Sequence, residues 1–142
     1  MPVNIQVPDA VLSAKQTRQM LESLQPGDQI FQNQTHGLFN AGLMGRLLKS
    51  NPEMFERYEV PLDIELLEYV FKNIELNSEV ISSMSNERLH EPVFMVTLAD
   101  KEPHLLIDGH HRVAARGMHQ QTYLRAYVAD RKATEIINVV KW

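Results

Sequence analysis

The stretch that decides the fold is Leu105-Leu-Ile-Asp-Gly-His-His-Arg-Val-Ala-Ala-Arg-Gly-Met118. Its apolar start predicts a strand that ends at Asp108, and the pattern after Gly109 predicts a helix over residues 110–119. A strand that turns through glycine into a helix brings unpaired N–H groups to one place, and the helix dipole adds positive charge there. The segment therefore predicts an anion site of the kind that phosphate commonly occupies.

Charged and titratable side chains surround the start of this predicted helix. His110, His111 and Arg112 follow the glycine, and Arg116 and His119 share a helix face with Arg112. A cation in the first turn slightly destabilises a helix unless an anion binds nearby, so we interpret Arg112 as a sign of function. The opposite face is expected to pack on the sheet through Val113, Ala114, Gly117 and Met118.

Two other interpretations of the same residues stay open. Asp-Gly is an ordinary turn pair, and Asp108 could simply cap the helix. A metal site built from Asp108, His110 and a distant ligand is the second alternative. Histidines that chelate from a helix usually stand four residues apart, whereas alanines stand four residues after His110 and His111. The sequence therefore favours the anion site over the metal site.

Composition and charge exclude several classes of protein. The chain has 142 residues, of which 44% are hydrophobic and 23% charged, as expected for a single soluble domain. It has no cysteine, which excludes disulfides, thiolate metal sites and a cysteine nucleophile. No apolar run approaches the roughly 20 residues of a membrane span. We expect a cytoplasmic protein with no membrane association. The net charge of −4 argues weakly against non-specific binding of nucleic acid.

Helical patterns dominate the first part of the chain. Apolar residues at helical spacing predict a helix over residues 10–24, with Asp9 as its cap and Pro26-Gly27 at its end. The further expected elements are a loop or short strand at 30–31, an irregular segment over 32–37, a helix over 38–49 and a short strand over 58–61.

From residue 61 the helical pattern becomes clearer, and past Pro92 it changes to a β pattern. A helix is expected on the apolar stripe formed by Ile64, Leu67, Val70, Phe71 and Ile74. The elements expected after it are a helix capped by Asn77, a hairpin of 93–98 and 104–107 with a turn at 99–103, a strand over 123–128, and a helix or a strand over 133–140. The predicted fold class is α+β, with a helical N-terminal half before a small mixed sheet. We expect one domain over 1–142, in which 1–60 form a helical extension and 61–142 the core.

Residues 107–115, Ile-Asp-Gly-His-His-Arg-Val-Ala-Ala, resemble the ParB/sulfiredoxin superfamily. In that superfamily a hydrophobic strand ends at Asp-Gly and a Gly-x-x-Arg box opens a helix. Partition proteins of the ParB type carry Gly-Glu-Arg-Arg, sulfiredoxins carry Gly-Cys-His-Arg, and ParB-like free serine kinases carry the most similar form, Asp-Gly-His-His-Arg. The segment Glu91–Val96 is also similar to a strand pattern of the family, and the resemblance covers about residues 89–130. It implies a ParB/sulfiredoxin-like fold and a nucleotide ligand (ATP, ADP or CTP) with magnesium.

The resemblance also implies roles for single residues. Gly109 would let the phosphate approach the backbone, and the N–H groups of His110 to Arg112, with the Arg112 side chain, would hold it. Asp108 would orient the loop or help to organise magnesium. Sulfinic acid reduction is excluded, because position 110 is not cysteine, and a complete partition protein is not expected. The acidic base of the serine kinases has no aligned position, and the candidates for it are Glu53, Glu56, Glu59, Asp63 and Glu65.

Three functions follow in order of preference. The first is a nucleotide-phosphate-binding domain, as an NTP-dependent phosphotransferase or hydrolase. In it Arg112 and Arg116 would help the box amides to bind phosphate, and Asp108, His110 and His111 would be the catalytic candidates. The second is a metal-dependent ParB-like nuclease that uses the same three catalytic candidates. The third is a non-catalytic DNA-partition or regulatory adaptor. Nucleic acid is a partner in the nuclease and DNA-partition hypotheses. The sequence does not decide whether the protein is catalytic or what its oligomeric state is.

Overall fold

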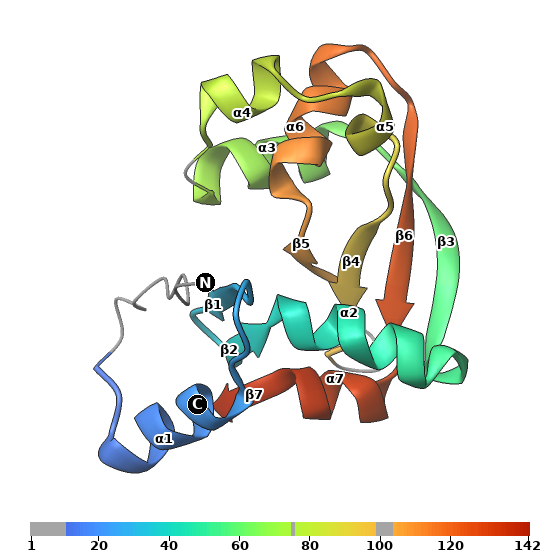
Figure 1. Cartoon of the computed structure of the whole chain (residues 1–142). Coiled ribbons are helices and arrows are strands. Elements are labelled where there is room, and N and C mark those ends of the chain that lie inside the picture. Colours follow the sequence, from blue (N-terminus) through green and yellow to red (C-terminus); the bar gives the residue numbers. More distant parts are fainter. Residues whose placement is uncertain (1–10, 75, 99–103) are drawn as a thin grey trace.

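The segment 105–118 forms the edge strand of a four-stranded sheet and the helix that follows it, as the computed structural model in Figure 1 shows. The structure describes residues 11–74, 76–98 and 104–142. The strands of this sheet are β3 (Phe55–Pro61), β4 (Val93–Val96), β5 (Leu105–Asp108) and β6 (Tyr123–Ala129). Their order is β3-β6-β4-β5, in which β4 runs parallel to β6 and the other neighbours are antiparallel. The predicted hairpin of β4 and β5 is confirmed, and its turn at 99–103 lies outside the described residues.

Helices cover one face of this sheet. They are α3 (Ile64–Asn73), α4 (Ser78–Ser82), α5 (Asn86–Leu89) and α6 (His110–Met118). Val113 and Ala114 of α6 are fully buried there, as predicted, and Gly117 lets α6 lie against Leu67 of α3, because a Cβ at that position would be 2.6 Å from a Leu67 methyl carbon. Met118 is 66% exposed. Its predicted place on the packed face is wrong, since the helix ends there and the chain turns away.

The apolar stripe of α3 is narrower than predicted. Val70 is fully buried and Leu67 packs against the same core, whereas Ile64 and Phe71 are largely exposed. Asp63 caps this helix, and Asn77 caps α4 as predicted, because its side chain accepts from the N–H groups of Glu79 and Val80. Both caps are local signals and fix where the two helices begin.

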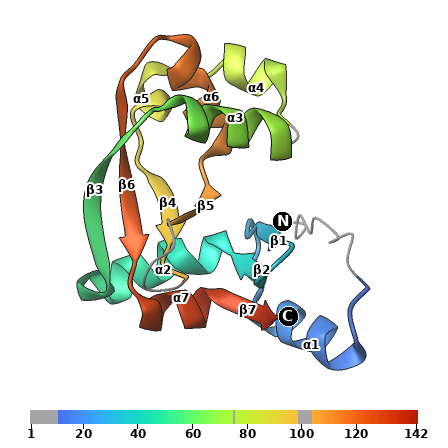
Figure 2. The same cartoon turned by 180° about the vertical axis from the view of Figure 1, so that it is seen from behind.

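The other face of the sheet packs on α2 (Ala41–Ser50) and α7 (Arg131–Ile137), seen from both sides in Figures 1 and 2. The two helices adjoin strands of a second, three-stranded antiparallel sheet of order β1-β2-β7, since α2 follows β2 and α7 precedes β7 in the chain. The strands of this second sheet are β1 (Ile30–Asn33), β2 (Gly37–Asn40) and β7 (Asn138–Lys141). The helix α1 (Ala14–Ser23) packs against this second sheet, and the short 3₁₀ helix η1 (Pro52–Met54) precedes β3. The architecture is therefore α+β.

The predicted helical extension over residues 1–60 is wrong in its described part. That region contains β1, β2 and most of β3, and β3 is an edge strand of the main sheet. The helix expected from residue 38 begins at Ala41, because Asn40 caps it by accepting from the Leu43 N–H group at 3.1 Å. Leu38 and Phe39 instead lie in β2, where every residue is buried and no alternation marks the strand. The region 133–140 contains both alternatives, the end of α7 and then β7.

The first helix begins later than predicted. Ser13 and Gln16 form a reciprocal capping box, so α1 starts at Ala14 and Val11 to Ser13 are not helical. The predicted cap, Asp9, lies outside the described residues. None of the helices in the described residues is long and apolar enough to cross a bilayer.

A buried carboxylate fixes the segment that leads into β1. Asp28 is only 3% exposed and forms an ion pair with Arg46, and it also accepts hydrogen bonds from Asn40 and the Gln25 N–H group. Burial opposes ionisation, but these hydrogen bonds outweigh it and lower the pKa of Asp28. Gly42 makes room for the carboxylate, because a Cβ there would lie 1.9 Å from its oxygen. The network holds residues 29–31 in place beside the main sheet.

Candidate anion-binding site

The junction between β5 and α6 has the predicted form. Gly109 is the N-cap of α6 in the left-handed conformation, with φ +99°, and no side chain caps the helix. The first helical hydrogen bond runs from the Val113 N–H group to the Gly109 carbonyl, at 3.0 Å. The N–H groups of His110, His111 and Arg112 therefore have no partner within the helix. The alternative in which Asp108 caps α6 is wrong, because its carboxylate is directed to Arg112 instead.

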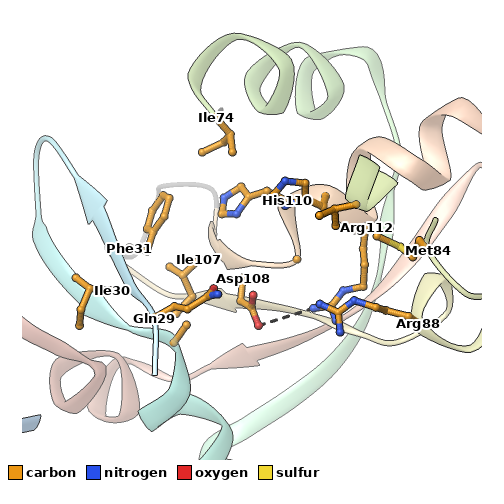
Figure 3. A pocket seen from close by; sticks show the side chains of 14 residues that line it. Gln29, Ile30, Phe31, Ile74, Met84, Arg88, Ile107, Asp108, His110 and Arg112 are labelled. Carbon is orange, nitrogen blue, oxygen red and sulfur yellow. Dashed lines mark ion pairs between the residues drawn. The ribbon is translucent and has the colours of Figure 1, made fainter. Parts of the chain in front are cut away.

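His110, His111 and Arg112 line a pocket of about 490 Å³, which we call the α6 pocket. Figure 3 shows it from close by. It lies where the β5–α6 junction meets the segment leading into β1 on one side and the region of α3 to α5 on the other. Its lining residues are Gln29, Ile30, Phe31, Ala41, Ile74, Val80, Met84, Arg88 and the continuous run 107–112.

The guanidinium of Arg112 is buried beside the turn. Arg112 is 6% exposed, and its Nη1 donates to Glu91 Oε2 at 3.0 Å. Its Nη2 lies 3.8 Å from Asp108 Oδ2, the ion pair drawn in Figure 3, and 2.9 Å from where a Cβ on Gly109 would be. Its Nε is buried and has no hydrogen-bond partner. The predicted phosphate-binding cation thus stays at the turn and is not directed into bulk water.

His110 is a buried, neutral imidazole. It is 8% exposed and stacks on Phe31 with ring centroids 5.1 Å apart. Figure 3 shows the two rings beside each other. Burial lowers its pKa to about 4, although Asp108 and a hydrogen bond to the Leu106 backbone act in the opposite direction. Its Nε2 is buried without a hydrogen-bond partner. An unpaired buried nitrogen is costly, and here it lies in a residue that lines the α6 pocket.

This buried imidazole makes stability sensitive to mild acid. In the unfolded chain His110 gains a proton near pH 6.5, whereas in the folded chain it stays neutral down to about pH 4. Its contribution is therefore complete above pH 6.5 and is lost as the pH falls towards 4, by about 2 kcal/mol between pH 7.5 and 5. Urea unfolding at both pH values should show a smaller loss for His110→Gln than for the wild type. The exposed His119→Gln serves as control, and equal losses in all three proteins would contradict the assignment.

His111 links α6 to the start of α4 through a hydrogen bond. Its Nε2 accepts from the Asn77 N–H group at 3.0 Å, so this lone pair is already used. Asn77 in turn caps α4 through its side chain. His111 lines the α6 pocket, but its Nε2 is occupied in a structural contact.

Arg116 does not line the α6 pocket. It is 6% exposed, and it donates to the Tyr123 carbonyl at 2.7 Å through Nη2 and to the Leu89 carbonyl at 3.3 Å through Nη1. One helical turn separates it from Arg112, which moves it about 6 Å along the axis from the N–H groups. The structure therefore places Arg116 as a link between α5, α6 and β6, away from the predicted phosphate site.

Several residues in or beside the α6 pocket lack a local sequence signal for their role there. Glu91 contacts Arg112 from 21 residues away, and Phe31 reaches His110 from the second sheet. Arg88 lines the pocket and lies 3.9 Å from the Glu91 carboxylate. Long-range packing brings Glu91 and Phe31 to α6, so local patterns do not predict these two contacts.

The side chains proposed for metal or acid–base chemistry diverge. Asp108 is directed to Arg112, His110 to Phe31 and His111 to Asn77. Within the described ranges no three His, Asp or Glu side chains gather as a metal site would require. None of the five acidic candidates for the base, Glu53, Glu56, Glu59, Asp63 and Glu65, lines the α6 pocket.

Comparison of the chain with models of known families, with curated proteins and with solved structures finds no significant match. The α6 pocket is therefore interpreted from its own geometry and charge.

Proposed function

We propose that the α6 pocket binds the phosphate group of a nucleotide and that the chain is a member of the ParB/sulfiredoxin superfamily. The observation that carries the proposal is the buried guanidinium of Arg112 beside the left-handed Gly109 turn. The superfamily assignment rests on the Asp-Gly-His-His-Arg box at this turn.

The phosphate end of the ligand would meet the first turn of α6. Its N–H groups and the helix dipole favour an anion at this position. Arg112 adds a guanidinium that burial keeps close to the turn, and its Nε lacks an acceptor. Hydrogen bonds between a guanidinium and a phosphate are among the strongest that side chains form. An anion here would meet N–H groups that have no partner within α6, beside a guanidinium whose Nε has no acceptor.

The organic part of the ligand would meet the apolar part of the same pocket. Phe31, Ile74, Val80 and Met84 supply this surface, and Figure 3 shows Phe31 and Ile74 away from the Arg112 end. The volume of about 490 Å³ lies in the usual range for small-molecule pockets. A ligand with one anionic end and one apolar end fits both regions, as a nucleotide does.

Magnesium is the proposed companion of the phosphates. Asp108 lines the pocket with a carboxylate that is 37% exposed, and proteins commonly bind magnesium through one or two carboxylates together with ligand phosphates. Asp108 therefore fits as the residue that would hold the ion, and the ion would offset charge on the phosphates.

The geometry favours binding over catalysis. Nε2 of His111 already accepts a hydrogen bond, and the imidazole of His110 stacks on Phe31. Asp108 and the two histidines do not converge, which gives no support to the metal-dependent nuclease. The proposal is therefore limited to a nucleotide-binding domain.

Isothermal titration calorimetry tests this function. ATP, ADP and CTP are each titrated with magnesium into the chain, and adenosine serves as the ligand without phosphate. We expect saturable binding of at least one of the three nucleotides and a much weaker signal for adenosine. Absence of heat for all three nucleotides would contradict the proposal, as would adenosine binding as tightly as ATP.

A further inference from the structure

We propose that Glu91 is a built-in competitor for the phosphate site, which occupies Arg112 in the free protein and leaves it when an anionic ligand binds. The proposal rests on the function proposed above and adds a residue that sets the affinity for the anion. It also predicts that removing this acidic side chain strengthens binding.

The contacts make Glu91 the exchangeable member of the cluster. Its Oε2 lies 3.0 Å from Arg112 Nη1 and 3.9 Å from Arg88 Nη1, so one carboxylate oxygen serves two cations. The side chain of Arg112 is only 8% exposed, whereas that of Glu91 is 53% exposed. The buried cation cannot move into water without leaving the pocket, but the carboxylate can turn outward and regain its hydration.

The backbone also makes Glu91 the easier of the two acidic partners of Arg112 to displace. Asp108 belongs to β5 and pairs with Phe94 in the sheet, and it contacts Arg112 only at 3.8 Å. Glu91 lies in the connection between α5 and β4, outside any helix or strand. Its shorter contact is made by an exposed side chain, and exposed ion pairs contribute little to stability. Glu91 is therefore the carboxylate that a ligand displaces.

Competition follows from charge and from the number of donors. Glu91 now occupies the Nη1 donor of Arg112, so a phosphate oxygen that approaches this nitrogen competes with the carboxylate for it. Two anions on the same side of one guanidinium repel each other, so the bound phosphate and the Glu91 contact exclude one another. Release of Glu91 also frees Arg88, whose side chain lines the pocket. Both arginines then become available to the ligand.

The test compares Glu91→Gln with the matched variant Glu87→Gln, titrated with ATP and magnesium at low ionic strength. Glu87 lies on α5 and is exposed, so its replacement removes the same charge at a neighbouring position. We expect Glu91→Gln to lower the Kd by about threefold or more and Glu87→Gln to change it by less than about 1.5-fold. Thermal unfolding of each variant verifies that it is folded.

A second variant keeps the inference testable if Glu91→Gln is unstable. Glu91→Asp retains the charge but shortens the side chain, so we expect a Kd between those of the wild type and Glu91→Gln. If the wild type binds ATP and neither Glu91 variant binds it more tightly, this inference is wrong and the proposed function stands. If neither the wild type nor the variants bind ATP, both are wrong.

Discussion

Replacing Gly109 with alanine is expected to lower the free energy of unfolding by about 3 kcal/mol and to abolish binding of ATP. Gly109 adopts φ +99°, which costs an L-residue energy in any surroundings. The new Cβ would also lie 2.5 Å from a Val93 methyl carbon and 2.9 Å from Arg112 Nη2. The substitution therefore strains the turn and displaces the guanidinium. Urea unfolding and calorimetry measure the two effects.

Substitutions at two other glycines separate the effect of the positive φ from the effect of the steric contacts. Gly27 has φ +89° with open space where a Cβ would be, so Gly27→Ala should lose only the conformational part, about 1–2 kcal/mol. Gly45 lies within α2 with open space and no positive φ, so Gly45→Ala should gain up to about 1 kcal/mol. Neither control should alter ATP binding. Equal destabilisation by Gly109→Ala and Gly27→Ala would show that the contacts at Gly109 do not matter.

Replacing Arg112 with methionine is expected to weaken ATP binding about 30-fold while the chain stays folded. Methionine keeps most of the apolar stem, and the two carboxylates left behind are both partly exposed. Removing a buried charge also removes its desolvation cost. We therefore expect a change in stability below about 1.5 kcal/mol. Calorimetry gives the affinity and urea unfolding gives the stability.

The matched control for Arg112 is Arg125→Met. Arg125 lies opposite Glu59 in the β3–β6 pairing and is exposed, away from the α6 pocket. It removes the same charge, so a general electrostatic effect would weaken ATP binding in both variants alike. A loss confined to Arg112→Met supports direct contact with the phosphate. Unchanged binding in Arg112→Met would contradict the proposed site.

The β5–α6 junction was predictable because its signals are local. An apolar run, an Asp-Gly turn and a change to helical spacing all fall within residues 105–118, and the structure places β5, Gly109 and α6 there. Asn77 was likewise predictable as a cap, because capping acts over two or three residues. The coarse α+β class followed from the same local patterns.

The parts that were not predictable depend on contacts distant in sequence. Leu38 and Phe39 pack into two different core clusters, so β2 lacks the alternation of polar and apolar residues that distinguishes a strand from a helix in the sequence. Arg116 shares a helix face with Arg112, yet carbonyls of Leu89 and Tyr123 hold it away from the pocket. Glu91 became part of the site only through the fold. Periodicity shows which face a residue occupies but not which partner meets it.

Backbone amide chemical shifts test the central claim most directly. Titration of the ¹⁵N-labelled chain with ATP and magnesium places each response on a single N–H group. Binding at the α6 pocket predicts saturable shifts that are largest for the amides of residues 109–112. Saturable shifts centred elsewhere, such as the polar hollow beside Lys15 and Lys141, or no saturable shift at residues 109–112, would contradict it.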